Sequence, residues 1–129
     1  MKASKLAALK LSLRVIGALA MLGGVFFVIW PSGFRWHPYH PYYEQMIVGI
    51  YFTLGVFLWR AASNPMEHLS LIWFAVWSSV VHAAIMAGQA LTGAEHHGHL
   101  VGDVPILFGA AALLGYLTPA KAGSLARAA

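Results

Sequence analysis

The chain has 129 residues, of which 60% are hydrophobic and only 9% are charged, and its formal net charge is +4. About a quarter of the residues in a soluble domain are charged, so this composition excludes an ordinary soluble domain and is typical of a membrane protein. The chain contains no cysteine, which excludes disulfides, thiolate metal ligands and thiol catalysis.

Four apolar segments follow one another along the chain, at about residues 11–30, 43–62, 67–91 and 100–118. A helix needs about 20 mostly apolar residues to cross a bilayer, within a range of about 17 to 25. All four segments reach this length, but the second does so only by including Glu44 at one end and Arg60 at the other. The sequence therefore predicts an all-α fold, a four-helix transmembrane bundle that forms a single domain over residues 1–129.

Positive charges mark one side of this predicted bundle. Loops rich in Lys and Arg stay in the cytoplasm, so we expect both termini there, in a multi-pass protein of the bacterial plasma membrane. Membrane topology thus accounts for the basic residues, and no nucleic-acid partner is predicted. Seven of the eight Lys and Arg residues lie on the predicted cytoplasmic side, and only Arg35 lies opposite: Lys2, Lys5, Lys10, Arg14, Arg60, Lys121 and Arg127.

Histidines gather in the two loops of the opposite, periplasmic side. Imidazole together with carboxylate suits transition metals, so these loops are candidates for binding Cu, Zn or Fe. A solvated loop without metal is the competing interpretation, because these spacings are weak motifs and histidine is ordinary at a membrane interface. The first loop contributes His37 and His40, and the second contributes His96, His97 and His99.

Three further ionisable residues are predicted to lie at a similar depth near that side. His82 falls inside the third apolar segment, Asp103 starts the fourth and Glu44 starts the second. An ionisable side chain in a membrane-crossing segment costs about 2.5 to 3.5 kcal/mol on insertion scales, so such residues are functional-site candidates. We expect His82 to share a hydrogen bond or a metal with Glu44 or Asp103, with His99 joining them. The alternative is that His82 bonds a carbonyl or a serine across the bundle.

Small residues spaced four apart allow helices to approach closely in a membrane. The sequence leaves two uses for them open, which are packing within this chain and contacts with other copies or another subunit. On the second interpretation the protein is a homo-oligomer or a subunit of a membrane complex. The pairs are Ala83 with Ala87, Ala84 with Gly88, and Ala111 with Gly115.

Several stretches resemble one group of proteins, the small bacterial four-helix membrane proteins that carry only a domain of unknown function. The resemblance covers the second to fourth segments, and it implies the fold and a bacterial origin without implying an activity. The stretches are YEQMIVGIY at 43–51, GVFL at 55–58, SLIWF at 70–74, WSSVVH at 77–82 and GHLVGDVP at 98–105.

Motifs of known enzymes are missing from the sequence. It has no nucleophile elbow, no phosphate loop and no His-Glu-x-x-His zinc helix, so a non-enzymatic role is favoured. The sequence predicts a small plasma-membrane protein with a periplasmic layer of His and carboxylate, a candidate for metal binding and for oligomerisation. The alternatives are a structural accessory subunit without bound metal and a small membrane oxidoreductase.

Overall fold

The computed structural model describes residues 1–120, and over that part of the chain it contains helices and no strand. Four helices are long and four are short. In chain order they are α1 (Ala3–Met21), α2 (Gly23–Ile29), α3 (Pro31–Phe34), α4 (Pro41–Ala61), η1 (Pro65–His68), α5 (Leu69–Ala90), η2 (Ala94–Leu100) and α6 (Asp103–Leu117).

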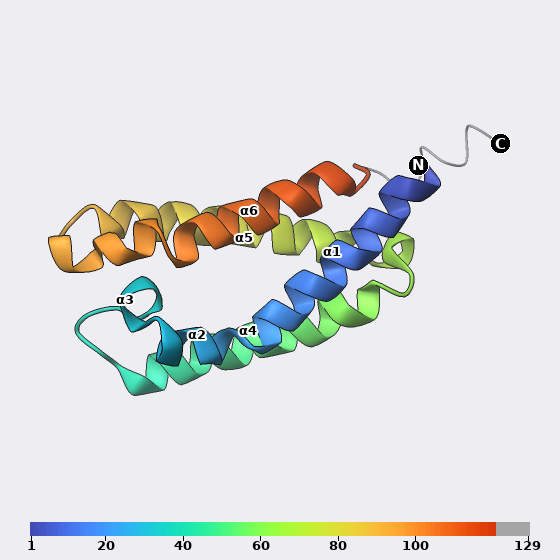
Figure 1. The fold of residues 1–129 in the computed structure, drawn as a ribbon. Helices are drawn as coiled ribbons and strands as arrows, with labels where there is room; N and C mark the ends of the chain where they lie inside the picture. Colours follow the sequence, from blue (N-terminus) through green and yellow to red (C-terminus); the bar gives the residue numbers. More distant parts are fainter. Residues whose placement is uncertain (121–129) are drawn as a thin grey trace.

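The helices form two pairs that run the length of the molecule (Figure 1). In one pair α1 and α2 lie along α4, and in the other α5 lies along α6. One end of the molecule holds the N-terminus, residues 62–64 and the end of α6, and we call it the Lys/Arg end. The other end holds α3, residues 35–40 and residues 91–102, and we call it the histidine end. The predicted cytoplasmic residues Lys121 and Arg127 lie outside the described residues.

The first apolar segment differs from the continuous helix expected over residues 11–30. The helix begins at Ala3, and α1 and α2 meet at Leu22 with a bend of 54°. Gly23 and Gly24 follow the break, and paired glycines are a common cause of kinks because they have low helix propensity. Prolines set the later starts, since Pro31, Pro41 and Pro65 all stand in the first turn of a helix, where the missing N–H costs nothing.

Glycine lets α1 and α4 approach at backbone distance. A Cβ atom added to Gly17 would lie 2.8 Å from the carbonyl oxygen of Gly55, and one added to Gly55 would lie 2.8 Å from the backbone nitrogen of Met21. These distances are shorter than real Cβ contacts, so no larger residue fits at either position without a shift of the helices. This crossing fixes the first helix pair.

A closed apolar core joins the two pairs at the Lys/Arg end. All four long helices contribute to it, and nearby the ammonium of Lys5 lies 4.9 Å from the ring centre of Tyr116. The indole N–H of Trp73 also donates a hydrogen bond of 3.1 Å to the carbonyl oxygen of Pro119. The buried members of this core are Leu9, Leu13, Leu58, Ala62, Ile72, Ala75, Val76, Ala111, Leu114 and Leu117.

Two segments of the described chain are long and apolar enough to cross a membrane. They are Pro65–Ala90 and Ala94–Leu117, and the bent pair of α1 and α2 makes a third if it forms one span. The α4 helix, whose segment barely reaches the required length in the sequence, is not among them. The all-helical fold is therefore as predicted, and the structure supports two or three crossings where the sequence predicts four.

Candidate functional site

A cavity of about 530 Å³ separates the two helix pairs toward the histidine end, and we call it the interhelical cavity. Its volume is within the range of about 300 to 1,000 Å³ that is usual for small-molecule sites. Apolar side chains from α1, α2, α4, α5 and α6 form most of its wall. Phe34 and Trp36 line it at the histidine end.

The polar residues of the wall are unevenly distributed along the cavity. On α5 the lining positions are spaced three or four apart, which places them on one helical face. This face runs from the apolar Ala75 through Ser79 and His82 to Gln89, near the histidine end. The cavity wall is thus apolar toward the Lys/Arg end, and its polar residues lie from the middle of α4 and α5 to the histidine end.

His82 and Tyr51 form a hydrogen bond between the two helix pairs. The Tyr51 hydroxyl oxygen and His82 Nδ1 are 2.8 Å apart, and either atom can donate depending on the imidazole tautomer. Both side chains line the interhelical cavity. Tyr51 is thus the partner of His82, where the sequence led us to expect Glu44 or Asp103. Tyr51 was not among the residues predicted from the sequence, although a side chain with a polar tip inside an apolar helix is a usable signal.

His99 is the most enclosed polar residue of the histidine end, with none of its surface exposed. Its Nδ1 lies 2.9 Å from Asp103 Oδ2, and its Nε2 donates to the backbone carbonyl oxygen of Arg35 at 3.0 Å. The indole ring of Trp36 stacks on the imidazole, with ring centres 3.9 Å apart and planes inclined by 14°. His99 therefore connects η2 and α6 with the segment that follows α3.

The hydrogen bonds of His99 fix the number of protons that it shares with Asp103. A carbonyl oxygen can only accept, so Nε2 must carry a hydrogen. Either Nδ1 carries one as well, which makes an imidazolium beside a carboxylate, or a protonated Asp103 donates to Nδ1. The pair has no net charge in either arrangement.

Asp103 also faces the interhelical cavity. It is 9% exposed, and its Oδ1 atom is buried without a hydrogen-bond partner among residues 1–120. Buried acceptors are normally satisfied, because leaving one unpaired costs about 1 to 3 kcal/mol. Asp103 thus combines a place in the cavity wall with a buried acceptor atom that no residue of the described chain satisfies.

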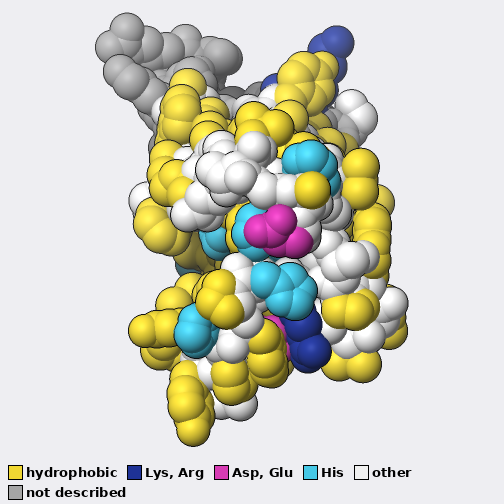
Figure 2. All heavy atoms as spheres, turned by 90° about the vertical axis from the view of Figure 1, so that its left-hand side faces the viewer, with side chains coloured by type: hydrophobic (Ala, Val, Ile, Leu, Met, Phe, Trp, Pro, Cys, Tyr) yellow, Lys and Arg dark blue, Asp and Glu magenta, His cyan; other side chains and the backbone are white. Residues whose placement is uncertain are grey.

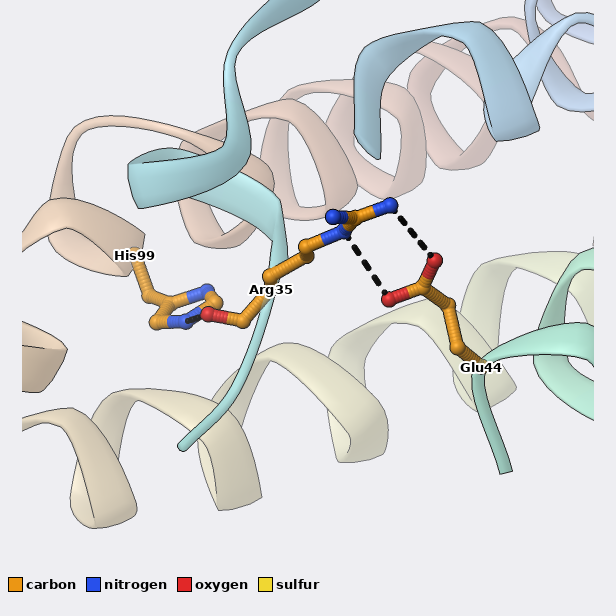
Figure 3. Close-up of polar contacts among 3 residues, drawn as sticks. All are labelled: Arg35, Glu44 and His99. Atoms are coloured by element: carbon orange, nitrogen blue, oxygen red, sulfur yellow. Dashed lines mark hydrogen bonds and ion pairs between the residues drawn. The ribbon is translucent and has the colours of Figure 1, made fainter. Parts of the chain in front are cut away.

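Glu44 lies on α4 and pairs with Arg35 (Figure 3). Arg35 Nη2 donates to Glu44 Oε1 at 3.2 Å, and Arg35 Nε lies 3.2 Å from Glu44 Oε2. The guanidinium also lies over the ring of Tyr39, 4.9 Å from its centre. Because Arg35 contacts both Glu44 and His99, one residue links α4 to η2. The sequence marked Arg35 only as the single positive charge on its side.

Two glycines let α3 lie directly against η2. A Cβ atom at Gly98 would collide with the backbone oxygen of Ser32, and one at Gly102 would collide with that of Gly33. Gly98 and Gly102 are spaced four apart, which is the spacing of small residues that allows close approach of helices. The prediction from the sequence applied this spacing only inside the apolar segments and therefore did not include these two glycines. We call this contact, together with the bonds of His99, the α3–η2 contact.

The remaining histidines are dispersed over the surface of the histidine end. Figure 2 shows that His, acidic and basic side chains gather there among hydrophobic ones. His37, His40 and His97 are exposed, and the His40 ring lies edge-on to Tyr43 at 5.6 Å. His96 Nε2 lies 3.7 Å from Glu95 Oε1.

Metal binding finds no support in this geometry. Among residues 1–120, no group of three or more His, Asp or Glu side chains is arranged to hold a metal ion. The structure instead divides the predicted ligands into separate contacts, namely His82 with Tyr51, His99 with Asp103, and Glu44 with Arg35. A metal shared by these residues would require them to exchange their present partners.

Small residues are used for packing within the chain at several of the predicted positions. Ala83 is fully buried, Ala111 is 4% exposed, and a Cβ atom at Gly115 would contact Val76 at 3.6 Å. Ala84 and Gly88 are exposed, and nothing lies within 4 Å of an added Cβ at Gly88. Of the three predicted pairs, only Ala84 with Gly88 forms an exposed small-residue face, which lies on α5.

The fold and the cavity define an all-helical protein with helices suited to crossing a membrane. The chain belongs to a family described as Family of unknown function (DUF6632), whose model matches residues 3–128. The predicted likeness to an uncharacterised family is thus confirmed. No curated protein and no solved structure matches the chain.

Proposed function

We propose that this protein binds an apolar molecule with one polar end, taken from the surrounding bilayer, in the interhelical cavity. The observation that carries the proposal is the graded wall of that cavity. Leu58 and Leu114 line its apolar part toward the Lys/Arg end, and Tyr51, His82 and Asp103 line it from the middle of α4 and α5 to the start of α6. A wall with this gradient matches a molecule whose polar end is near the membrane interface and whose apolar body is in the membrane interior.

Access from the side supports this proposal. Three residues of the cavity wall are also exposed at the lateral surface, where Leu19 is 45% exposed, Ile47 41% and Ile106 48%. In a membrane this surface faces lipid, so a molecule dissolved in the bilayer can enter between the helix pairs without crossing water. The cavity is then filled from the bilayer.

The proposal places the chain in the bacterial plasma membrane, with four crossings and both termini in the cytoplasm. The antiparallel order of α1, α4, α5 and α6 supports it, because the start of α1, next to Lys2, and the end of α4, which carries Arg60, lie at the same end of the molecule (Figure 1). Arg35, the exception, is neutralised by Glu44. The exposed pair Ala84 and Gly88 supports association with a second copy or another membrane protein.

Photolabelling in nanodiscs tests whether the cavity is occupied. The probe is a hexadecane chain that carries a diazirine, and mass spectrometry maps the labelled residues. We expect labelling of Met86, which lines the cavity, and its loss in Ala110→Trp, which fills the cavity. The control is Ala112→Trp on the exposed face of α6. Labelling confined to lipid-facing residues such as Phe74 would contradict the proposal.

Cysteine labelling tests the topology, and the chain has no cysteine of its own. We expect Ser32→Cys and Ala94→Cys to react with a membrane-impermeant maleimide added to intact spheroplasts. Ser63→Cys, at the Lys/Arg end, should react only after permeabilisation. The opposite pattern would reverse the orientation, and reaction of all three sites from outside would remove the crossings of both α4 and α5.

Metal binding at the histidine end is a separate hypothesis that rests on the sequence alone. Elemental analysis of the purified protein tests it, with the metal counted per chain. If a metal is bound at the predicted site, His82→Ala should lower its occupancy far more than His68→Ala, because His68 lies at the Lys/Arg end. Equal losses in the two variants would indicate a general destabilisation.

A further inference from the structure

We infer, on the basis of the function proposed above, that the polar end of the bound molecule is an uncharged hydroxyl group that donates a hydrogen bond to Asp103 Oδ1. The ligand class is a lipid or other long-chain molecule that ends in an alcohol. Fatty acids and anionic phospholipids fall outside this class. Three features of the cavity support the assignment.

The first feature is the unpaired acceptor. Asp103 is nine-tenths buried, it lines the cavity, and its Oδ2 atom is used by His99 at 2.9 Å. Its Oδ1 atom has no partner among the described residues. A donor on the ligand would satisfy this atom, whereas a purely apolar ligand would keep it both dry and unpaired.

The second feature is the charge of the wall. Among residues 1–120 no Lys or Arg lines the cavity, and the His82 imidazole in its wall already bonds the Tyr51 hydroxyl, so an anionic head group would find no permanent counter-charge among these residues. The His99–Asp103 pair is neutral as a unit, and Arg35, whose carbonyl oxygen accepts from His99, pairs its guanidinium with Glu44. A cationic head group would therefore also lack a partner. Burying an unpaired charge is costly, so the wall selects an uncharged group.

The third feature is position. Asp103 is the first residue of α6, at the histidine end, and the α6 residues that line the cavity beyond it are apolar as far as Leu114. A chain that extends from a hydroxyl at Asp103 therefore follows the apolar wall toward the middle of the molecule. The head group then lies at the histidine end, which on the proposed topology is near the membrane interface.

Three photolabelling probes test the assignment in nanodiscs that contain the full chain. They share one diazirine-bearing hexadecyl chain and end in a hydroxyl, a carboxylate or a methyl group. The labelling of the cavity residue Met86 is divided by that of the lipid-facing residue Phe74, which corrects for the amount of each probe in the bilayer. We expect the hydroxyl probe to exceed the other two roughly two- to tenfold, the value of one net hydrogen bond.

Two variants at the same position locate the preference. In Asp103→Asn a neutral His99 can accept from the amide N–H at Nδ1, which leaves the amide oxygen facing the cavity, so the hydroxyl preference should persist. In Asp103→Leu the acceptor is gone, and the three probes should label the cavity equally. If Asp103→Leu does not fold, the comparison of probes in the natural chain and in Asp103→Asn still decides.

The outcomes separate this inference from the proposed function. No hydroxyl preference in the natural chain, or a preference that survives in Asp103→Leu, overturns the assignment while cavity labelling upholds the proposed function. Loss of the preference in Asp103→Asn assigns recognition to charge and also overturns it. If no probe labels Met86 above Phe74, the proposed function itself fails.

Discussion

The two ends of this molecule are closed by different kinds of contact. At the Lys/Arg end, apolar side chains of all four long helices interlock, and Leu9, Leu13 and Ile72 are completely buried. At the histidine end the helix pairs separate around the interhelical cavity. There the main contacts are backbone against backbone at Gly98 and Gly102, the hydrogen bonds of His99, the stacking of Trp36 on its ring and the ion pair of Arg35 with Glu44.

This difference matters because a bilayer changes what holds helices together. Lipid tails are as apolar as leucine, so helix association depends on close packing and on hydrogen bonds between helices. Packing at the Lys/Arg end is spread over many side chains, whereas the histidine end depends on a few residues. We therefore expect single substitutions to open the histidine end while the Lys/Arg end stays closed.

The largest effect is expected at the crossing of α1 and α4. Gly55→Val should lower the free energy of unfolding by about 3 kcal/mol, because the new side chain must displace the Gly17 backbone. The measurement is unfolding in mixed micelles by added dodecyl sulfate, followed by circular dichroism. Gly49→Val on the same helix is the control, since nothing lies within 4 Å of an added Cβ there. Equal losses in both variants would contradict the crossing.

The next effect concerns the histidine end alone. Gly102→Ala should cost about 1 to 2 kcal/mol, because its methyl group collides with the backbone oxygen of Gly33. Spin labels on the exposed positions His37 and His97 should move apart in the variant, whereas labels on Lys2 and Ser63 should keep their distance.

Gly109→Ala provides the control for this prediction. It lies on α6 as well, and nothing lies within 4 Å of an added Cβ. Its spin-label distances should match those of the natural chain. An increase at both ends of the molecule in Gly102→Ala would show that the ends are not independent, and the contrast between them would then be wrong.

The sequence predicts the helices well because their signals are local. Apolar runs and the prolines at 41 and 65 place α4 and α5 to within a few residues. The bend at Leu22 was missed, because a glycine pair inside an apolar run is compatible with a straight or a kinked helix. Whether the helix bends there depends on how α2 packs against α4, and a sequence pattern does not give that packing.

The contacts of the candidate site were predicted less well, because a similar depth in the membrane does not determine which side chains form hydrogen bonds with one another. His82, Asp103 and Glu44 were placed at one depth, yet each bonds a different residue. Arg35 and Trp36 reach His99 through a loop whose path follows from tertiary contacts. The contact of His99 with Asp103 is the one that the sequence could indicate by itself, because residues four apart lie on the same face of a helical turn.

A smaller effect is expected at the ion pair of the histidine end. The side chains of Arg35 and Glu44 are 34% and 16% exposed, so solvent screens their attraction. A double-mutant cycle with Arg35→Gln and Glu44→Gln should give a coupling of about 0.5 to 1 kcal/mol that falls with added salt. Glu95→Gln is the control for the loss of a carboxylate at this end, because Glu95 contacts His96 and not Arg35, so its coupling with Arg35→Gln should be close to zero.

The same substitutions separate side-chain from backbone contributions to the α3–η2 contact. His99 bonds the backbone carbonyl of Arg35, so Arg35→Gln should leave the spin-label distance between positions 37 and 97 unchanged. A longer distance would mean that the ion pair itself closes the histidine end.

The smallest effect on the folded chain is expected at Ala84. Ala84 and Gly88 form an exposed small-residue face on α5, so a larger side chain meets lipid in the monomer and should change chain stability by less than about 0.5 kcal/mol. If copies associate through this face, Ala84→Leu separates their backbones and should weaken association by about 1 kcal/mol, roughly fivefold. Energy transfer between labelled copies diluted in vesicles measures this. Unchanged transfer would place any partner on another surface, because the neighbouring small residues Ala83 and Ala111 are already buried within the chain.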